Sequence, residues 1–389
     1  MSASRIHFDH NATTPMRPGV RALLENALGR PMEGNPSSVH AEGRSMRRRL
    51  EQARERVARV LGAIPREVAF TASGTEGNAL ALMGAFLGAG PTRRRVVLSA
   101  IEHPSLQRAA DTLAKLGAEV VRVAPGRNGR VDADAFLAQV DGTTAVASLM
   151  WANNETGVLQ PVDRVARVCR ERAVPFHTDA VQVAGRRPVR LHEVDAAMLT
   201  LSGHKFGGPP GSGVLVVRRN TPFHSVLGGH QEDGLRGGTQ ATWLAEGLAL
   251  ALEEAAQEAL QGEVPAALAA LRDDFEARVQ RAFPDVLALG AGAGRLPHVS
   301  MLEFPGIDGE ALLIGLDLAG ISASSGAACA SGTLAPSHVL LAMGHTPARA
   351  QSCLRFSLGP ETDAAAVDRV VEALREQVPR ARDAARGLA

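Results

Sequence analysis

Lysine is rare in this chain, and one of its two lysines lies in a setting suited to chemistry. Of the 42 lysines and arginines, only Lys115 and Lys205 are lysines. An arginine keeps its proton at accessible pH, whereas a lysine can be tuned into a neutral amine nucleophile. Lys205 lies in SGHKFGGPPGSG, after an apolar run and before glycines that let backbone approach a ligand closely. It is a candidate Schiff-base lysine, with a phosphate-neutralising or surface lysine as the alternative. Lys115, near the end of an amphipathic helix, is interpreted as structural.

Asp179 is a second candidate, because it ends the short run PFHTD. A carboxylate at a buried strand end is costly unless it faces a cation. A protonated pyridine nitrogen would be such a cation, and an acid beside it makes the ring an electron sink. The alternative is a metal site that joins His177 and Asp179, two apart on one strand face, with His204.

The segment FTASGTEGNALALMGAFL predicts a strand, a glycine-containing turn and a helix. Free amide groups at a helix N-terminus attract anions, and Thr75 would add a hydroxyl beside Gly74. Thr75 could instead serve only as the helix cap. Because Ser202 and His204 come from a neighbouring strand end, a phosphate pocket is the favoured interpretation.

The three cysteines, Cys169, Cys329 and Cys353, form no C-x-x-C pair, which argues against a disulfide framework or a thiolate metal cage. Cys329 lies in SSGAACASGTLAPSH, whose small residues indicate a loop able to carry a thiol into a cleft; an inert buried cysteine is the alternative. Cys169 is expected within a helix, and Cys353, in the alternating CLRFSLG, within a packed strand. Arg355 of that strand could clamp a carboxylate bidentately or form a plain surface ion pair.

An α/β sheet would bring these residues together. From about residue 55 to 220, short apolar runs alternate with helix-like stretches, which is typical of a sheet with crossover helices on both faces. Ligands of such sheets bind outside the carboxyl ends of the strands, where SGTEGN, IEHPS, WANNETG, DAVQ and SGHKFGGPPGSG are expected. Five converging loops predict one large site. The expected strands are residues 68–71, 95–99, 120–123, 145–150, 176–179, 197–202 and 213–218.

A chain of 389 residues is long for one compact core, so two domains are expected. After Thr242 the pattern changes to long helices through residue 279, then strands at 299–303 and 354–358 and a terminal helix from about 363. We expect a large domain at 15–254 and a smaller α+β domain at 255–389, to which residues 1–14 return.

The charge balance argues against two classes of partner. Lysine and arginine number 42 against 41 acidic residues, which gives no field strong enough to hold nucleic acid or a charged membrane. The start MSASRIHFDHN lacks a basic region followed by an apolar one, and no apolar run approaches the span of a bilayer. The expected location is the cytoplasm.

Taken in order, the motifs resemble those of a known family. The chain is similar to the class V, fold-type I pyridoxal-phosphate enzymes, specifically cysteine desulfurases of the iron-sulfur-cluster-assembly type. The match extends over nearly the whole chain, through DHNATTP, GNPSS, SGTEGN, EHPS, NNETG, HTDAVQ, SGHK, RGGT, SSGAACASGTLAPSHVL and RFSLG. It implies the fold-type I transferase architecture, in which a large domain with a mostly parallel seven-stranded sheet between helices carries a smaller α+β C-terminal domain.

The resemblance also implies a cofactor, pyridoxal 5'-phosphate, and residues to hold it. Lys205 would bind it covalently, His103 would stack on its ring and assist proton transfer, and Asp179 would pair with the pyridine nitrogen. Gln182 would contact the ring hydroxyl. The phosphate would be held by Gly74, Thr75, Ser202 and His204, and by Thr239 from the second subunit of a homodimer.

For the substrate, the resemblance implies that Asn154 and Arg355 bind the carboxylate of L-cysteine, with Asn35 close by, and that Cys329 is the nucleophile. The implied reaction gives L-alanine and a persulfide on Cys329, which supplies an acceptor protein for iron-sulfur cluster assembly or tRNA thiolation. The alternatives are a selenocysteine lyase, a class V aminotransferase, a non-catalytic sulfur-relay scaffold and a metal hydrolase. The small-residue loop around Cys329 favours desulfurase over aminotransferase, and Lys205 with Asp179 argues against pure binding.

Overall fold

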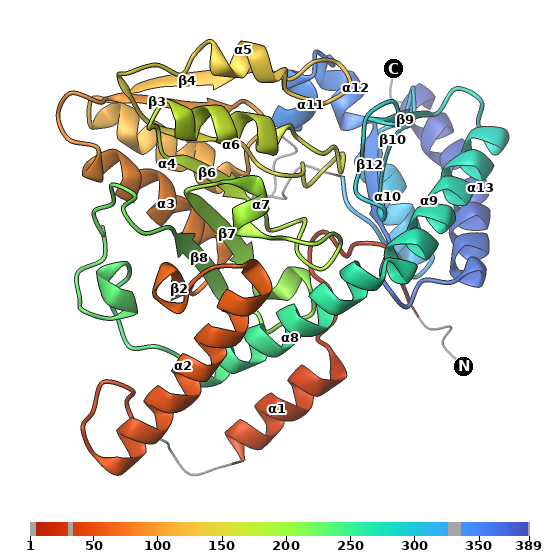
Figure 1. The fold of residues 1–389 in the computed structure, drawn as a ribbon. Coiled ribbons are helices and arrows are strands. Elements are labelled where there is room, and N and C mark those ends of the chain that lie inside the picture. The colour runs from red at the N-terminus through yellow and green to blue at the C-terminus, as the bar shows by residue number, and fades with distance from the viewer. Residues whose placement is uncertain (1–4, 30–33, 326–335, 388–389) are drawn as a thin grey trace.

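A seven-stranded sheet forms the centre of the molecule (Figure 1). The computed structural model describes residues 5–29, 34–325 and 336–387. The strand order is β2-β8-β7-β6-β5-β3-β4, and only β8 runs antiparallel to its neighbours. The strands are β2 (Val68–Thr71), β3 (Arg95–Ser99), β4 (Glu119–Val123), β5 (Thr144–Ser148), β6 (Phe176–Asp179), β7 (Met198–Ser202) and β8 (Gly213–Val217). All seven predicted strands are confirmed, with ends that differ by two residues at most.

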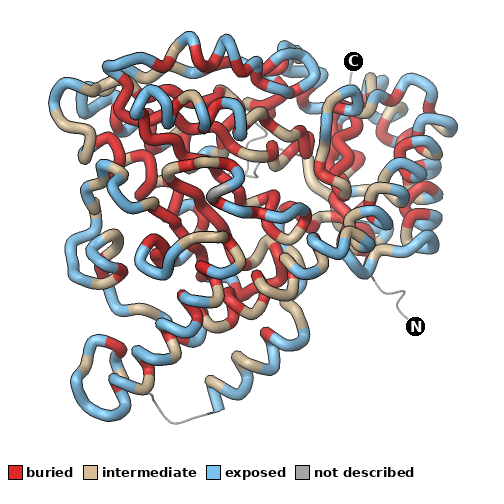
Figure 2. Tube along the Cα trace, in the orientation of Figure 1, coloured by how far each residue is buried: buried red, intermediate tan, exposed pale blue. Residues whose placement is uncertain are grey.

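Helices cover both faces of this sheet, which explains why its strands are continuous apolar runs rather than alternating ones. In β8, Leu215 and Val217 pack with residues of α3 and α4, whereas Val214 and Val216 belong to the core on the other face. Figure 2 shows the resulting buried centre. The helices of the large part are α1 (Pro18–Leu28), α2 (Ala41–Leu61), α3 (Gly74–Gly88), α4 (Pro104–Lys115), α5 (Ala133–Leu137), α6 (Val162–Glu171), α7 (Leu191–Val194) and α8 (Thr242–Gln261).

The C-terminal part is built on an antiparallel sheet of order β12-β10-β9. Its strands are β9 (Leu287–Leu289), β10 (Val299–Glu303) and β12 (Cys353–Ser357), so the strand predicted at 354–358 begins one residue earlier. The helices of this part are α9 (Glu263–Ala282), α10 (Gly309–Leu318), α11 (His338–Ala342), α12 (Pro347–Gln351) and α13 (Ala364–Gly387).

Strand β12 lies between two cores. Successive side chains of a strand point to opposite faces. Leu354 and Phe356 accordingly pack in the small core, while Cys353 packs in the large one. Arg355, on the same face as Cys353, lines a cavity. Strand β12 thereby places the Arg355 side chain against the large part, while its neighbours Leu354 and Phe356 anchor the strand in the small part.

The N-terminal segment belongs to the small core. Strand β1 (Ile6–His7) pairs in parallel with β11 (Ile321–Ser322), and Ile6 and Phe8 are buried among residues of α9 and α13. The predicted boundary at 254/255 falls within the continuous helix α8, whose Ala255 still packs in the large core. We propose a division into two domains that are joined through α8.

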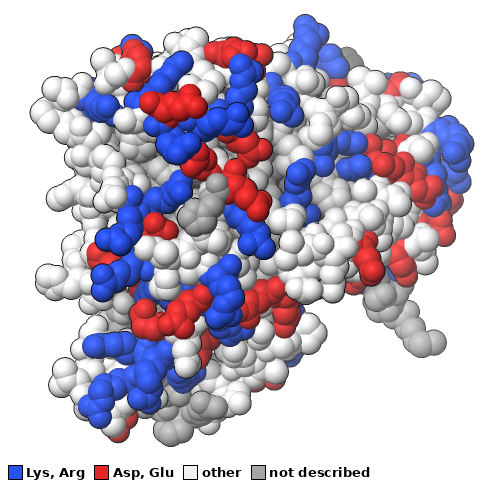
Figure 3. Space-filling view, in the orientation of Figure 1, with Lys and Arg blue, Asp and Glu red and all other residues white. Residues whose placement is uncertain are grey.

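The described helices include none that is long and apolar enough to cross a membrane. On the face shown in Figure 3, acidic and basic side chains lie interspersed, in keeping with their nearly equal numbers.

A buried ion pair fixes the edge strand β2, which leads into the start of α3. Arg54 Nη1 lies 2.6 Å from Glu232 Oε2, and the side chains are 7% and 0% exposed. Glu232 Oε2 also accepts from the amide of Phe70 (2.7 Å), and Arg54 donates to the carbonyl of Val68 (2.6 Å). The pair therefore ties α2 and the segment after β8 to the backbone of β2 at Val68 and Phe70.

We predict that Glu232→Gln destabilises the protein by about 2 to 4 kcal/mol, because it removes the buried counter-ion of Arg54 and leaves only the part-exposed carboxylate of Glu51, 3.1 Å from Arg54 Nε. Urea denaturation of both proteins measures the difference. Asp285→Asn, which removes the partner of the part-exposed Arg382, is the matched control and should cost less than about 1 kcal/mol. Equal losses in the two variants would contradict the prediction.

Candidate active site

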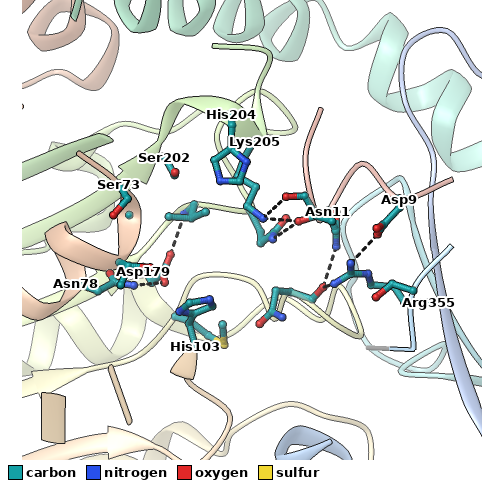
Figure 4. Close-up of a pocket in the computed structure, with 18 residues that line it drawn as sticks. Asp9, Asn11, Ser73, Asn78, His103, Asp179, Ser202, His204, Lys205 and Arg355 are labelled. Carbon is teal, nitrogen blue, oxygen red and sulfur yellow. Dashed lines mark hydrogen bonds and ion pairs between the residues drawn. The ribbon is translucent and has the colours of Figure 1, made fainter. Parts of the chain in front are cut away.

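One cavity of about 440 Å³ lies at the carboxyl ends of β6 and β7 (Figure 4). The starts of α3 and α4, the N-terminal segment and β12 complete its wall. The cavity brings together ten of the predicted site residues, namely Gly74, Thr75, His103, Asn154, Asp179, Gln182, Ser202, His204, Lys205 and Arg355. The five predicted loops therefore converge on one site.

Lys205 ends the short 3-10 turn Gly203–Lys205 that follows β7. Its Nζ donates to the carbonyls of Asn11 (2.5 Å) and Ala12 (2.9 Å). Burial, together with the positive charge of Arg355, lowers the pKa of Lys205 to about 8. A substantial fraction of the amine is therefore neutral at slightly alkaline pH, as a nucleophile or base requires.

Asp179 is buried at the end of β6 and faces the cavity (Figure 4). Its Oδ2 accepts from Asn78 Nδ2 (2.6 Å) and its Oδ1 from the amide of Val181 (3.0 Å). The carboxylate is thus fixed in orientation. His177, two residues earlier, is enclosed in the sheet, where its ring nitrogens contact the hydroxyls of Ser148 (2.9 Å) and Thr200 (3.0 Å). His177 therefore does not share the cavity with Asp179 and His204, as the alternative metal site would require.

His103 is the N-cap of α4. Its Nδ1 accepts from the amide of Ser105 (3.1 Å) and contacts the Ser105 hydroxyl (2.8 Å), which leaves Nε2 available to a ligand. Burial lowers the pKa of His103, so the ring favours its neutral form. Asn78 Nδ2 donates both to Ser105 Oγ (3.1 Å) and to Asp179. Sequence reasoning missed Asn78 and Ser105, although a serine two residues after a capping histidine is a local signal for this contact.

The start of α3 has the donors of an anion site. Ser73, rather than Thr75, caps the helix, since its Oγ accepts from the amide of Glu76 (3.1 Å). The interpretation of Thr75 as a mere cap is therefore wrong, and its exposed side chain lines the cavity. A Cβ on Gly74 would lie 2.9 Å from Val181 and 3.2 Å from Ser202, so only glycine lets the helix start this close to β7.

Arg355 is buried, with its side chain 6% exposed, and is not a plain surface ion pair. Its Nη1 donates to the carbonyl of Asn154 (2.9 Å) and its Nη2 to Asp9 Oδ1 (2.8 Å). Asp9 and Asn11, which sequence reasoning did not single out, line the same cavity. Gln182 Nε2 donates to the carbonyl of Asn11 (3.2 Å). His204 lies beside this segment, and burial followed by the charge of Lys205 lowers its pKa to about 4.

Three predicted residues are not among those that line the cavity. Asn35 is exposed in the loop before α2, where its Oδ1 accepts from the amide of Ser37 (2.8 Å). Thr239 lines a smaller hollow beside the end of β2. Cys329 lies outside the described residues.

The other two cysteines are core residues, as predicted. Cys169 is buried in α6 and Cys353 in β12. Burial raises the pKa of both thiols, that of Cys169 to about 12. Neither is suited to form a thiolate near neutral pH.

The residues of the cavity fit pyridoxal phosphate. The first amides of α3 and the hydroxyls of Thr75 and Ser202 suit a phosphate, and the absence of a Cβ at Gly74 keeps them close together. Asp179 offers a fixed carboxylate for a pyridinium nitrogen, and Lys205 offers an amine for an aldehyde.

Comparisons with known proteins agree with this geometry. The model of the aminotransferase class-V family matches residues 6–370. A cysteine desulfurase of Cereibacter sphaeroides is 40% identical over 373 residues, which cover 95% of each chain. A solved NifS-like protein has a TM-score of 0.89 at 31% identity and covers 97% of this chain and 100% of its own. SspA, solved in complex with cysteine, has a TM-score of 0.80 at 30% identity, over 92% of this chain and 100% of its own.

The structural neighbours confirm the fold-type I architecture that the motifs implied. Because the family match and the 40% identical relative both span nearly the whole chain, the protein belongs to the aminotransferase class-V family, in the group of the cysteine desulfurases.

Proposed function

We propose that this enzyme uses pyridoxal phosphate to remove sulfur from L-cysteine, which yields L-alanine and a persulfide on Cys329. The observation that carries the proposal is the convergence of a Lys205 amine of lowered pKa, the fixed carboxylate of Asp179 and the buried guanidinium of Arg355 in one cavity. The cysteine bound in the SspA structure supports the choice of substrate.

When bound, pyridoxal phosphate supplies an electron sink for the α carbon of an amino acid. The chain supplies position and proton transfer. The start of α3 with Thr75, Ser202 and His204 would hold the phosphate, Asp179 the ring nitrogen and Gln182 the ring hydroxyl. Arg355 and Asn154 would orient the substrate carboxylate, and the Lys205 amine would remove the α proton. The ring of His103 would stack on the cofactor ring, and its Nε2 would move protons, because Nδ1 is already hydrogen-bonded to Ser105.

Sulfur transfer requires a thiol that can reach the substrate. The thiolate of Cys329 would attack the substrate sulfur, and the carbon-sulfur bond would break with its electron pair left on the β carbon. The β carbon would take a proton to become the methyl group of alanine, and the α carbon would regain the proton that Lys205 removed. A free thiol has a pKa of about 8.5, so a base must raise its thiolate fraction, and His103 is the candidate.

We further propose a cytoplasmic homodimer that passes its sulfur to an acceptor protein, either a cluster scaffold or a thiolation relay. In the dimer, Thr239 would reach the phosphate site of the second subunit. Thr239 lines a separate hollow and not the cavity of its own chain, which leaves it free for this role.

The proposed function is tested by incubating purified protein with L-cysteine and pyridoxal phosphate and measuring alanine and sulfide. Both products are expected, from a yellow protein whose absorbance changes when L-cysteine is added. A colourless protein that forms neither product would overturn the proposal.

We predict that Lys205→Ala loses turnover by about 1,000-fold or more, because no arginine can replace its neutral amine. Alanine formation from L-cysteine is the measurement. Lys115→Ala, at the end of α4, is the matched control and should keep normal activity. A fully active Lys205→Ala protein would contradict the assignment.

The lowered pKa of Lys205 predicts its labelling by an amine-acylating reagent in the cofactor-free protein. Only the neutral amine reacts, so modification should rise with pH through a midpoint near 8, well below the pKa of about 10.5 of an ordinary lysine. Mass spectrometry of the peptide that contains Lys205 measures the labelled fraction. A midpoint near 10.5 would show that the amine is not perturbed.

We predict that Cys329→Ala still binds pyridoxal phosphate and L-cysteine, since those steps use Lys205, Asp179 and Arg355. Alanine formation should fall by about 100-fold or more, because the substrate sulfur loses its attacking nucleophile. Cys169→Ala and Cys353→Ala are the controls and should affect stability, by about 1 kcal/mol, more than chemistry. After L-cysteine, mass spectrometry should find extra sulfur on the Cys329 peptide, and its appearance on Cys353 would refute the assignment.

A further inference from the structure

An ion pair lines the cavity that is proposed to receive the substrate. Asp9 Oδ1 and Arg355 Nη2 are 2.8 Å apart, and both residues line the cavity wall (Figure 4). Arg355 Nη1 is occupied by the carbonyl of Asn154, and its buried Nε has no hydrogen-bond partner among the described residues. The site thus presents a negative and a positive group side by side.

Asp9 is held rigidly by its backbone. Its carbonyl accepts from the amides of Ala12 (3.0 Å) and Thr13 (3.3 Å), and it forms a bridge to Ser357 at the end of β12. The turn so formed presents the carbonyls of Asn11 and Ala12 to Lys205. The negative charge of Asp9 also raises the pKa of Lys205, whereas the larger effects of burial and of Arg355 lower it. Asp9 is therefore close enough to interact electrostatically with the Lys205 amine.

A carboxylate that binds Arg355 competes with Asp9. If the incoming molecule carries only a carboxylate, it crowds Asp9 with like charge and takes away part of its counter-ion, which is costly in a buried site. A zwitterionic amino acid offers its own ammonium group in exchange, so both carboxylates keep a cation.

We propose that, as the amino acid enters, Asp9 receives its α-ammonium group while Arg355 receives its α-carboxylate, so that the pair selects amino acids over simple carboxylates. The ammonium group leaves Asp9 when it gives up a proton and the neutral amine bonds to the cofactor. Asp9 is then a specificity-determining residue. This inference rests on the proposed function, because it takes L-cysteine as the molecule that enters the cavity.

The test compares L-cysteine with 3-mercaptopropionate, which lacks only the α-amino group. For the pyridoxal-phosphate-loaded enzyme and its Asp9→Asn variant, steady-state kinetics gives KM and kcat for L-cysteine. Calorimetry gives the Kd for 3-mercaptopropionate without turnover. The asparagine oxygen can still accept from Arg355, but it carries no charge.

We predict that Asp9→Asn raises KM for L-cysteine by about tenfold, as expected for the loss of a charge-assisted hydrogen bond, and changes kcat less. The Kd for 3-mercaptopropionate should fall, because the competing negative charge is gone. A residue that only held Arg355 in place would raise both constants, and that result, or no change in either, would overturn the inference.

Two further variants distinguish the role of the Asp9 charge from other effects of substitution. Asp9→Glu retains the negative charge, so it should retain the preference for L-cysteine over 3-mercaptopropionate. Loss of that preference in Asp9→Glu counts against the inference, and this comparison remains valid if Asp9→Asn fails to fold. Asp285→Asn, which breaks an aspartate-arginine pair outside the cavity, should move neither constant. If the parent enzyme forms no alanine at all, the proposed function itself fails, whereas an active parent with parallel shifts in Asp9→Asn rejects only the role of Asp9.

Discussion

Charged groups that are buried must be paired, and this constraint governs the whole site. Lys205, Asp179 and Arg355 are withdrawn from water, and none can stay there without partners. Lys205 donates to backbone carbonyls, and Asp179 accepts from a backbone amide and from the side chain of Asn78. Arg355 forms an ion pair with Asp9. These partners come from the N-terminal segment, from α3 and from the loop after β6, whereas Lys205 and Arg355 lie after β7 and on β12. The need for pairing therefore brings distant parts of the chain together.

The N-terminal turn at residues 9–13 makes contacts with both the large and the small part of the molecule. Asn11 donates to the carbonyl of Asn154 (2.9 Å) and contacts His298 Nε2 (2.8 Å), and its own carbonyl accepts from Lys205 and Gln182. Just before this turn, Ile6 and Phe8 are packed in the small core. The same short segment therefore contacts Lys205 and is anchored in the core that carries Arg355, so a shift between the two parts would disturb both residues.

The central sheet was predictable because strands that are buried on both faces consist of continuous apolar runs. The polar residues that follow those runs in the sequence identified most of the residues that line the cavity. The alternating CLRFSLG located β12 to within one residue, and it placed Cys353 in a packed strand. Asp9 and Asn78 were missed for a physical reason: their roles depend on Arg355 and Asp179, which are 346 and 101 residues away in the chain, and no local pattern records such pairings. Thr75 was ambiguous because a hydroxyl at the start of a helix has two uses, and only the capping bond of Ser73 decides between them.

The histidines of the site follow from the same constraint. Burial lowers the pKa of His103 and His204, so both favour the neutral form and leave the positive charge of the cavity to Lys205 and Arg355. A neutral imidazole can stack on a ring or donate to a phosphate without adding charge, whereas two further cations would oppose the protonation of a pyridine nitrogen at Asp179. Among the described residues that line the cavity, Lys205 is the cation whose lowered pKa lets it give up its proton near neutral pH. This property explains why a chain that otherwise uses arginine almost everywhere keeps a lysine at this position.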